Sequence, residues 1–167
     1  MMRDGMMRRA SLGAWWGLLV WLALSAIAAG IGAAVTLPQI PGWYGGLIKP
    51  SFTPPNWAFG PAWTILYIMM ALAVWLVCRT PAASGRGWAV TLYLVQLVLN
   101  GLWSVLFFHL HLLLAAAIDI ILLLFVLGAT AVAFHPRHRL AGWLLVPYLL
   151  WVGYAGGLSW SIWGANP

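Results

Sequence analysis

The sequence contains very few charged residues. Only two acidic side chains occur among its 167 residues, and charged residues of both signs make up 6% of the chain, against 64% hydrophobic residues. Soluble domains carry about 25% charged residues. This composition excludes a soluble globular domain and predicts an integral membrane protein.

The chain is equally short of the side chains that hydrolytic enzymes and metal sites need. Cys78 is the single cysteine, which excludes an internal disulfide, and the acids are Asp4 and Asp119. His109 and His111 are spaced by two residues and therefore do not share a helix face. No Ser, His, Asp arrangement and no metal cluster is expected, so the sequence predicts no catalytic residue of the hydrolytic kind, no metal site and no obligatory cofactor.

Five long apolar runs remain when the chain is divided at its charges and prolines. A helix rises about 1.5 Å per residue, and roughly 20 residues cross a hydrocarbon core of about 30 Å. A cleaved signal peptide is the alternative for the first run, but signal cores span about 7–15 residues and this run is longer. We therefore predict an all-α integral membrane protein, a single domain over residues 1–167, with five spanning helices at about 12–35, 58–78, 88–108, 111–134 and 140–162.

The basic residues are distributed unevenly between the two sides that five spans define. Lys49 stands alone on one side, and the other side carries Arg3, Arg8, Arg9, Arg79, Arg86, Arg137 and Arg139. The positive-inside rule then puts the N-terminus in the cytoplasm and the C-terminus outside, with a bacterial inner membrane as the default location. The net positive charge is thus a topology signal, and no nucleic-acid partner is expected.

Residues 43–67, WYGGLIKPSFTPPNWAFGPAWTILY, form an aromatic and proline-rich stretch that leads directly into the second span. Connections in compact domains are usually about 4–6 residues long, and much longer ones tend to be functional or disordered. This stretch is too aromatic to be typical of disorder. We predict a long structured loop between helices 1 and 2, with residues 38–57 acting as a lid (the lid, below) over a binding site.

Polar side chains occur at a few positions inside the spans. Gln96, Asn100 and Trp103 fall on one face of the third span, and Asp119 lies within the fourth, with no lysine or arginine in the second to fifth spans to neutralise it. Amides facing lipid are costly, so these side chains should point into the bundle, either as hydrogen-bonding partners of other helices or as part of a site.

Counting depth along each helix places most unusual side chains in one half of the membrane. Trp63, Tyr67, Asn100, Trp103 and Asp119 come out about 8–15 Å below the outer surface, with Gln96, Tyr148 and Trp151 nearer the midplane. Most of the 13 tryptophans fit an interfacial belt, whereas Trp63, Trp103 and Trp151 are set deeper. These positions predict an aromatic, amide-lined pocket in the outer half. Pro147, inside the fifth span, is expected to bend that helix.

The sequence resembles the TspO/translocator protein family, the tryptophan-rich sensory proteins also known as peripheral-type benzodiazepine receptor homologues. The matching motifs are WYGGLIKPSFTPPNWAFGPAWTILYIMMALA, QLVLNGLWSVLFF, the lone Asp119 and PYLLWVGYAGGLSWSIW, in family order and spacing. The resemblance implies a five-helix bundle, usually a homodimer, that binds porphyrins such as haem and protoporphyrin IX. It also implies that Tyr44, Trp63, Asn100 and Trp151 line the pocket.

Two departures from the family pattern are visible. Animal members bind sterol through an aromatic residue followed by a basic one near the C-terminus, and nothing after Arg139 is basic here, so sterol binding by that motif is not expected. Ser159 stands where many members have asparagine.

The leading hypothesis is a porphyrin-binding sensory or regulatory protein of the lipid bilayer. Its predicted ligand-binding residues are Tyr44, Lys49, Trp63, Tyr67, Gln96, Asn100, Trp103, Asp119, Tyr148 and Trp151. Two alternatives stay open: transport of porphyrins or other small amphipathic solutes, and light-dependent porphyrin degradation, in which Trp63 and Trp151 would supply electrons. An assembly factor for another membrane protein is a third.

Overall fold

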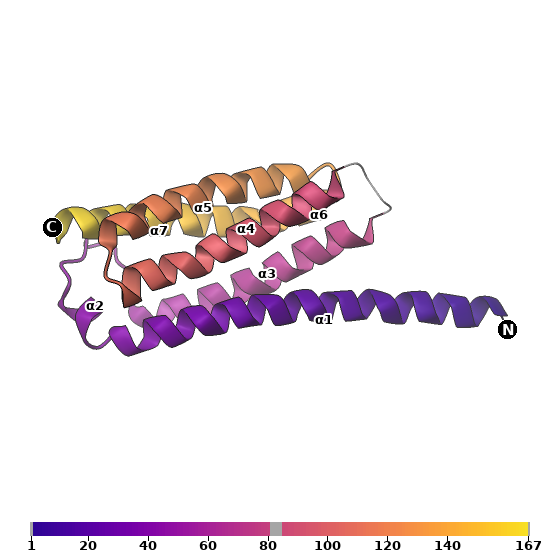
Figure 1. The fold of residues 1–167 in the computed structure, drawn as a ribbon, viewed down its shortest axis with the longest axis horizontal. Helices are drawn as coiled ribbons and strands as arrows, with labels where there is room; N and C mark the ends of the chain where they lie inside the picture. Colours follow the sequence, from indigo (N-terminus) through magenta and orange to yellow (C-terminus); the bar gives the residue numbers. More distant parts are fainter. Residues whose placement is uncertain (1, 81–84, 167) are drawn as a thin grey trace.

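The computed structural model describes residues 2–80 and 85–166, with side chains from Trp15 onward, and every long element in these residues is a helix (Figure 1). The long helices are α1 (Met2–Thr36), α3 (Phe59–Arg79), α4 (Arg86–Ser104), α5 (Leu113–Phe134) and α7 (Val146–Ala165), and a short α6 (Arg139–Leu144) precedes α7. Five segments are long and apolar enough to cross a membrane: Trp15–Gln39, Asn56–Arg79, Arg86–His109, Leu113–Phe134 and Arg139–Ala165. The predicted fold class, an all-α integral membrane protein with five spanning helices and a long structured loop, is confirmed.

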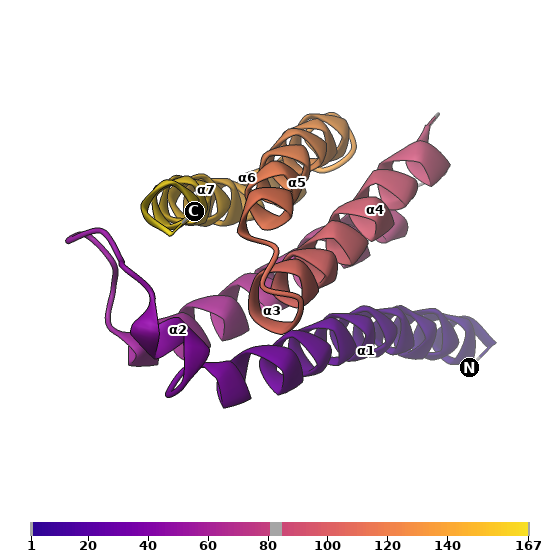
Figure 2. The same ribbon diagram turned by 60° about the vertical axis from the view of Figure 1, so that its left-hand side comes forward.

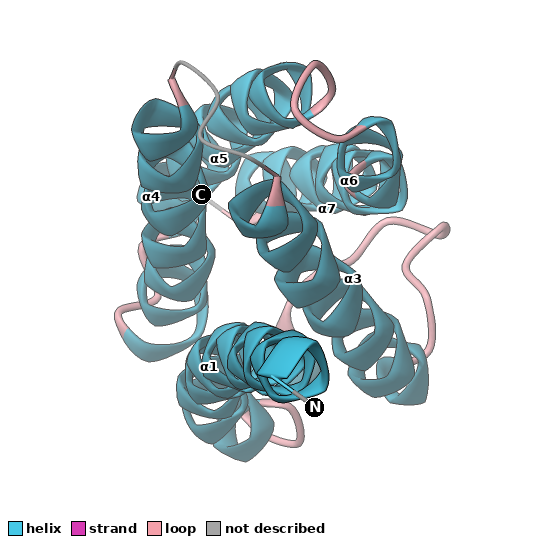
Figure 3. Cartoon of the chain, turned by 90° about the vertical axis from the view of Figure 1, so that its right-hand side faces the viewer, coloured by secondary structure: helices cyan, strands magenta, loops and turns pink. Residues whose placement is uncertain are grey.

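The lid lies at one end of the bundle, here called the loop end, and Arg79, Arg86, Arg137 and Arg139 lie at the other, here called the basic end. Viewed from the basic end, α1 packs beside α3 and α4, while α5, α6 and α7 lie on the opposite side (Figure 3). The lid contains three short helical turns: η1 (Leu37–Gln39), α2 (Trp43–Gly46) and η2 (Asn56–Ala58). It runs from the end of α1 past the end of α3 toward the C-terminus (Figure 2).

Two helices depart from the regular geometry that the apolar runs predict. The third span finishes in a π-helical turn, η3 (Val105–His109). The fifth span is interrupted at Leu145, and Pro147 lies in the first turn of the new helix, α7. Proline is tolerated there because amide hydrogens in a first turn have no partner within the helix. The interruption falls two residues before the proline at which a bend is expected, and the bend itself stays a prediction.

Helix α1 changes its packing partner along its length. Toward the basic end it packs on α3, where the Trp15 and Trp75 rings stack at 5.8 Å and Gly17 faces Trp75. Toward the loop end it packs on α4, where a methyl group added at Gly32 would lie 3.4 Å from Oγ of Ser104. The small residues of the first span therefore serve packing within the bundle at Gly17 and Gly32.

Closely fitted side chains fill the half of the bundle nearer the basic end. Met70, Tyr93, Leu127 and Phe134 are completely buried there, and Tyr93 shares a hydrogen bond of 3.1 Å with Ser25 of α1. In lipid the gain comes from packing and interhelical hydrogen bonds, since hydrocarbon is as apolar as the core. Among the described residues this half is therefore closely packed, and the cavity described below lies nearer the loop end.

Replacing Gly142 with alanine should destabilise the turn between α5 and α6. The new methyl carbon would lie 3.0 Å from Cβ and 3.1 Å from Cα of His135, and neither atom moves without the backbone. We expect the free energy of unfolding to fall by about 1–3 kcal/mol, the usual cost of overpacking. Thermal unfolding in detergent measures it. The matched control is Gly153→Ala, where nothing lies within 4 Å; equal unfolding temperatures for the two variants would contradict the prediction.

Candidate functional site

The lid begins with two aromatic side chains that pack on the turn between α4 and α5. The Trp43 ring stacks on His111 with centroids 4.0 Å apart and planes at 17°. Tyr44 is buried against Phe107 and Phe108, at 6.2 and 5.6 Å. Burial raises the pKa of the Tyr44 phenol above its ordinary value of 10.0, and Tyr154 adds to the effect. Tyr44 is therefore neutral at physiological pH and serves as an apolar anchor.

Lys49 fastens the turn that follows. Its ammonium donates hydrogen bonds to the carbonyl oxygens of Tyr44 at 2.8 Å, Gly45 at 3.2 Å and Leu47 at 3.0 Å, and lies 4.8 Å from the Tyr44 ring centroid. An ammonium has three hydrogens to donate, so these bonds use all the hydrogen-bond donors of the Lys49 side chain. Lys49 does not line the cavity described below.

The far part of the lid is tied to α7 at two points. The Asn166 side chain pairs with the backbone of Ile48, accepting from its N–H at 2.9 Å and donating to its C=O at 3.0 Å. The Tyr154 hydroxyl donates to the carbonyl of Phe52 at 2.6 Å, and the two rings are in edge contact. These ties hold the lid across the loop end.

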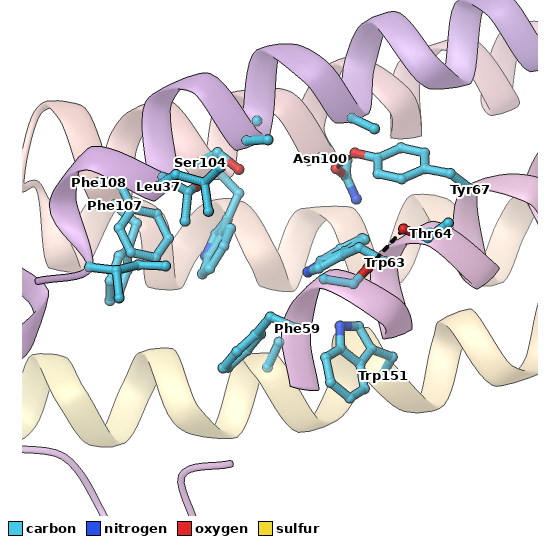
Figure 4. A pocket seen from close by; sticks show the side chains of 18 of the residues that line it. Leu37, Phe59, Trp63, Thr64, Tyr67, Asn100, Ser104, Phe107, Phe108 and Trp151 are labelled. Atoms are coloured by element: carbon cyan, nitrogen blue, oxygen red, sulfur yellow. Dashed lines mark hydrogen bonds between the residues drawn. The ribbon is translucent and has the colours of Figure 1, made fainter. Parts of the chain in front are cut away.

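A cavity of about 610 Å³ lies beneath the lid, between α1, α3, α4, η3 and α7 (Figure 4). Six of the ten predicted binding residues line it: Tyr44, Trp63, Tyr67, Asn100, Trp103 and Trp151. In Figure 4, Trp63 from α3 and Trp151 from α7 lie close together on one side of the space. Five of these residues come from spans and line the cavity from α3, α4 and α7, with Trp151 nearer the middle of its span, and Tyr44 comes from the lid.

Aromatic rings form much of the cavity wall. Trp63 lies 5.7 Å from Tyr67 and 6.0 Å from Tyr148, while Phe59 lies 5.9 Å from Trp151. On the other side Trp103 stacks on Phe107 at 5.2 Å. Rings at these separations support one another in fixed orientations, so flat apolar faces are presented to any guest.

One amide links three helices behind this wall. The Tyr67 hydroxyl donates to Oδ1 of Asn100 at 2.5 Å, and Nδ2 of Asn100 donates to the Tyr148 hydroxyl at 2.6 Å. The network joins α3, α4 and α7, and each of the three side chains is at least nine-tenths buried. Asn100 therefore has the interhelical role that its position inside a span predicts, and it also lines the cavity.

Three residues that line the cavity each carry a buried polar atom with no hydrogen-bond partner among the described residues: Nε1 of Trp103, Nε1 of Trp151 and Oγ of Ser159. The Ser159 side chain is 1% exposed. All three groups can donate a hydrogen bond, so a guest with neutral acceptor atoms would satisfy them only where the wall adjusts to expose them. Ser159 was not among the predicted site residues, although Trp151, Ala155 and Ser159 recur at four-residue spacing and so share one face of α7.

The other predicted residues lie outside the cavity lining. Gln96 is fully buried, with Nε2 3.7 Å from Sδ of Met70. Asp119 is 4% exposed on α5, and Tyr148 lies fully buried behind Trp63. Ligand contact by Gln96, Asp119, Tyr148 and Lys49 stays a prediction. Their positions fit a role in supporting the cavity wall better than a role in touching the ligand.

Among the lining residues that the structure describes, none is charged. A carboxylate inside the cavity would thus be desolvated without a cation to pair with it, which costs several kcal/mol. Within residues 2–80 and 85–166 no group of three or more metal-ligating side chains occurs either. The site is consequently suited to bind an apolar, planar body and to leave any charged substituent outside.

These features define a class: a five-helix membrane protein with an aromatic, uncharged cavity beneath a fastened lid. The sequence matches the profile of the TspO/MBR family over residues 10–164. The chain belongs to that family, as its motifs indicated.

Named relatives agree with this assignment. The tryptophan-rich protein TspO of Archaeoglobus fulgidus is 39% identical over 149 residues, covering 89% of this chain and 96% of the relative. The tryptophan-rich sensory protein of Cereibacter sphaeroides is 38% identical, covering 87% and 89%. The human translocator protein is 36% identical, covering 74% and 75%.

Proposed function

We propose that this protein binds a tetrapyrrole, protoporphyrin IX or haem, in the cavity beneath the lid and acts as a sensory or regulatory protein of the membrane. The observation that carries the proposal is the cavity itself, because its volume of about 610 Å³ falls in the range of about 300–1,000 Å³ usual for small-molecule sites. Its walls offer the flat rings that a planar macrocycle stacks on. Family membership and the sensory name of a relative support the same function.

The charge pattern supports one orientation of such a ligand. Since the described lining carries no charge, the macrocycle would occupy the interior and its two carboxylates would stay at a wet rim. Lys49 is engaged by three carbonyls, so an ion pair between Lys49 and a ligand carboxylate would require those bonds to open.

We further propose that the loop end faces the outside and the basic end the cytoplasm of a bacterial inner membrane. The arginines at the basic end support this sidedness through the positive-inside rule. Homodimerisation, implied by the resemblance, stays a prediction.

Replacing Trp151 with leucine should weaken porphyrin binding by about tenfold, because an aromatic stacking contact and a buried N–H donor are lost together. Quenching of tryptophan fluorescence on titration with protoporphyrin IX measures the affinity. Trp160→Leu on the same helix is the control, since Trp160 is 39% exposed and does not line the cavity. An unchanged affinity for Trp151→Leu would remove this residue from the site.

Light-dependent porphyrin degradation is a second candidate, supported by the ring contacts of Trp63. An electron from the Trp63 indole would reduce the excited porphyrin, and the reduced ring would pass that electron to dissolved dioxygen, which is the oxidant that this activity needs. Two tyrosines with ring centroids within about 6 Å of Trp63 would return an electron to the oxidised indole. The test is to record absorbance of the bound pigment in the dark and under illumination. A spectrum that does not depend on light excludes this activity.

Transport has less support. Toward the basic end the bundle is filled by buried apolar side chains such as Met70, Val74 and Leu127, so no polar path continues from the cavity. Porphyrin flux into sealed vesicles would separate transport from binding.

A further inference from the structure

The cavity wall is exposed along one side only. The lining residues on α4 and α7 are all buried or half-buried, whereas several lining residues on α1 and α3 are exposed. On α1 and η1 these exposed residues are Ala26, Ala33 and Leu37, and on α3 and its preceding turn they are Asn56, Gly60, Thr64 and Ile68. The two rows face each other across a slot between α1 and α3 (the slot, below).

The slot follows from the crossing of α1 over the bundle. Near the basic end α1 and α3 are joined by the contacts of Trp75 with Trp15 and Gly17. Near the loop end Gly32 of α1 faces Ser104 of α4 instead, and residues of α1 and α3 line the cavity from either side. From residue 26 to residue 37 the rim rises about 16 Å at 1.5 Å per residue, which is long enough to pass the edge of a planar macrocycle.

The slot opens toward lipid. All of its rim residues lie within the segments Trp15–Gln39 and Asn56–Arg79, which are long and apolar enough to span the membrane. The rim side chains are small or apolar except for Asn56 and Thr64, and the Thr64 hydroxyl is already bonded to the carbonyl of Gly60 at 2.9 Å. Such a rim has few free groups that could hydrogen-bond to water, and its apolar surface is compatible with the hydrocarbon of the membrane.

The loop end is fastened by contrast. Trp43 and Tyr44 pack on the turn between α4 and α5, Asn166 pairs with both backbone groups of Ile48, and Tyr154 bonds to Phe52. Entry from water beneath the lid would require these contacts to open together. Entry through the slot requires none of them to open.

We propose that the cavity exchanges its ligand sideways with the membrane, through the slot between α1 and α3. The ligand class is a planar, largely apolar molecule dissolved in the leaflet at the loop end, which matches the aromatic and uncharged lining of the cavity. This inference adds a route to the proposed tetrapyrrole function and rests on it only for the identity of the ligand.

A kinetic test uses neighbouring alanines of α1. Ala33 and Ala34 are both exposed, but Ala33 lines the cavity and Ala34 does not. In lipid nanodiscs we expect Ala33→Phe to slow association of protoporphyrin IX by about tenfold, corresponding to a barrier about 1.4 kcal/mol higher, and to slow dissociation as well, whereas a merely weakened site would release the ligand faster. Ala34→Phe should match the unsubstituted protein. Equal rates for both variants, together with faster association in Asn166→Ala, would overturn the lateral route in favour of entry beneath the lid.

A second test needs no porphyrin, so failure of the route is distinguishable from failure of the proposed function. Cys78 is the single cysteine, so a Cys78→Ser background accepts a nitroxide at Thr64→Cys on the rim, or at Ile65→Cys, which is 58% exposed and not on the cavity wall. We expect both nitroxides to collide often with membrane-dissolved oxygen and rarely with a water-soluble nickel chelate. Frequent collision of the position 64 label with the chelate would mean a water-filled entrance, and protection from both reagents would mean that the slot is covered; either result overturns the proposal.

Discussion

Replacing Trp63 with leucine is expected to lower the affinity for protoporphyrin IX by about 30-fold, the equivalent of about 2 kcal/mol for loss of a central aromatic contact. Trp63 lines the cavity and also contacts Tyr67 at 5.7 Å and Tyr148 at 6.0 Å. Its removal therefore takes away a stacking face and loosens the two rings behind it. The effect should exceed that of Trp151→Leu, since both ring partners of Trp63 are hydrogen-bonded to Asn100 in the network that joins α3, α4 and α7.

The measurement is a titration followed by porphyrin absorbance, which does not depend on the number of tryptophans left in the protein. Trp63→Phe should recover part of the loss because it restores a ring at the same place. Trp160→Leu, remote from the cavity, supplies the baseline. If Trp63→Leu binds as tightly as that baseline variant, the cavity is not the porphyrin site.

Much of the fold could be predicted because lipid imposes strict requirements on the chain. Unpaired backbone groups in hydrocarbon are so costly that long apolar runs must form helices. Helical phase also predicted that Asn100 faces the bundle, and its bonds to Tyr67 and Tyr148 agree. The break at Leu145 was not predicted because the hydropathy of the sequence does not change there. Pro147 is compatible with a bend in one continuous helix as well as with the start of a new helix.

The finer structure of the site depends on contacts distant in the sequence. Lys49 was predicted to bind the ligand, and the path of the chain folds its ammonium onto three nearby carbonyls, which the sequence does not indicate. The pairing of Asn166 with Ile48 joins positions 118 residues apart, and no local pattern indicates it. The slot likewise depends on the angle at which α1 crosses the bundle. The small residues of α1 allow that angle, but their positions in the sequence do not predict it.

Substituting Asn100 with leucine is expected to have the largest effect on stability. Leucine is similar in size but cannot bond, so the Tyr67 hydroxyl loses its acceptor at 2.5 Å and the Tyr148 hydroxyl loses its donor at 2.6 Å. Hydrogen bonds between membrane helices average about 0.6 kcal/mol and reach about 1.7 kcal/mol, and unpaired buried groups add about 1–3 kcal/mol. We expect the free energy of unfolding to fall by about 2–4 kcal/mol, together with weaker porphyrin binding, because α3, α4 and α7 lose their common link.

A double-mutant cycle tests the cause. Tyr67→Phe alone leaves Oδ1 of Asn100 without its partner, so it should also destabilise the protein, whereas Tyr67→Phe combined with Asn100→Leu removes both members of one pair. The combined loss should therefore be smaller than the sum of the single losses. Thr64→Val is the control, since its hydroxyl bonds only to its own helix at Gly60 and should change stability little. Strict additivity in the cycle would show that Tyr67 and Asn100 act independently, and the amide would then have no linking role.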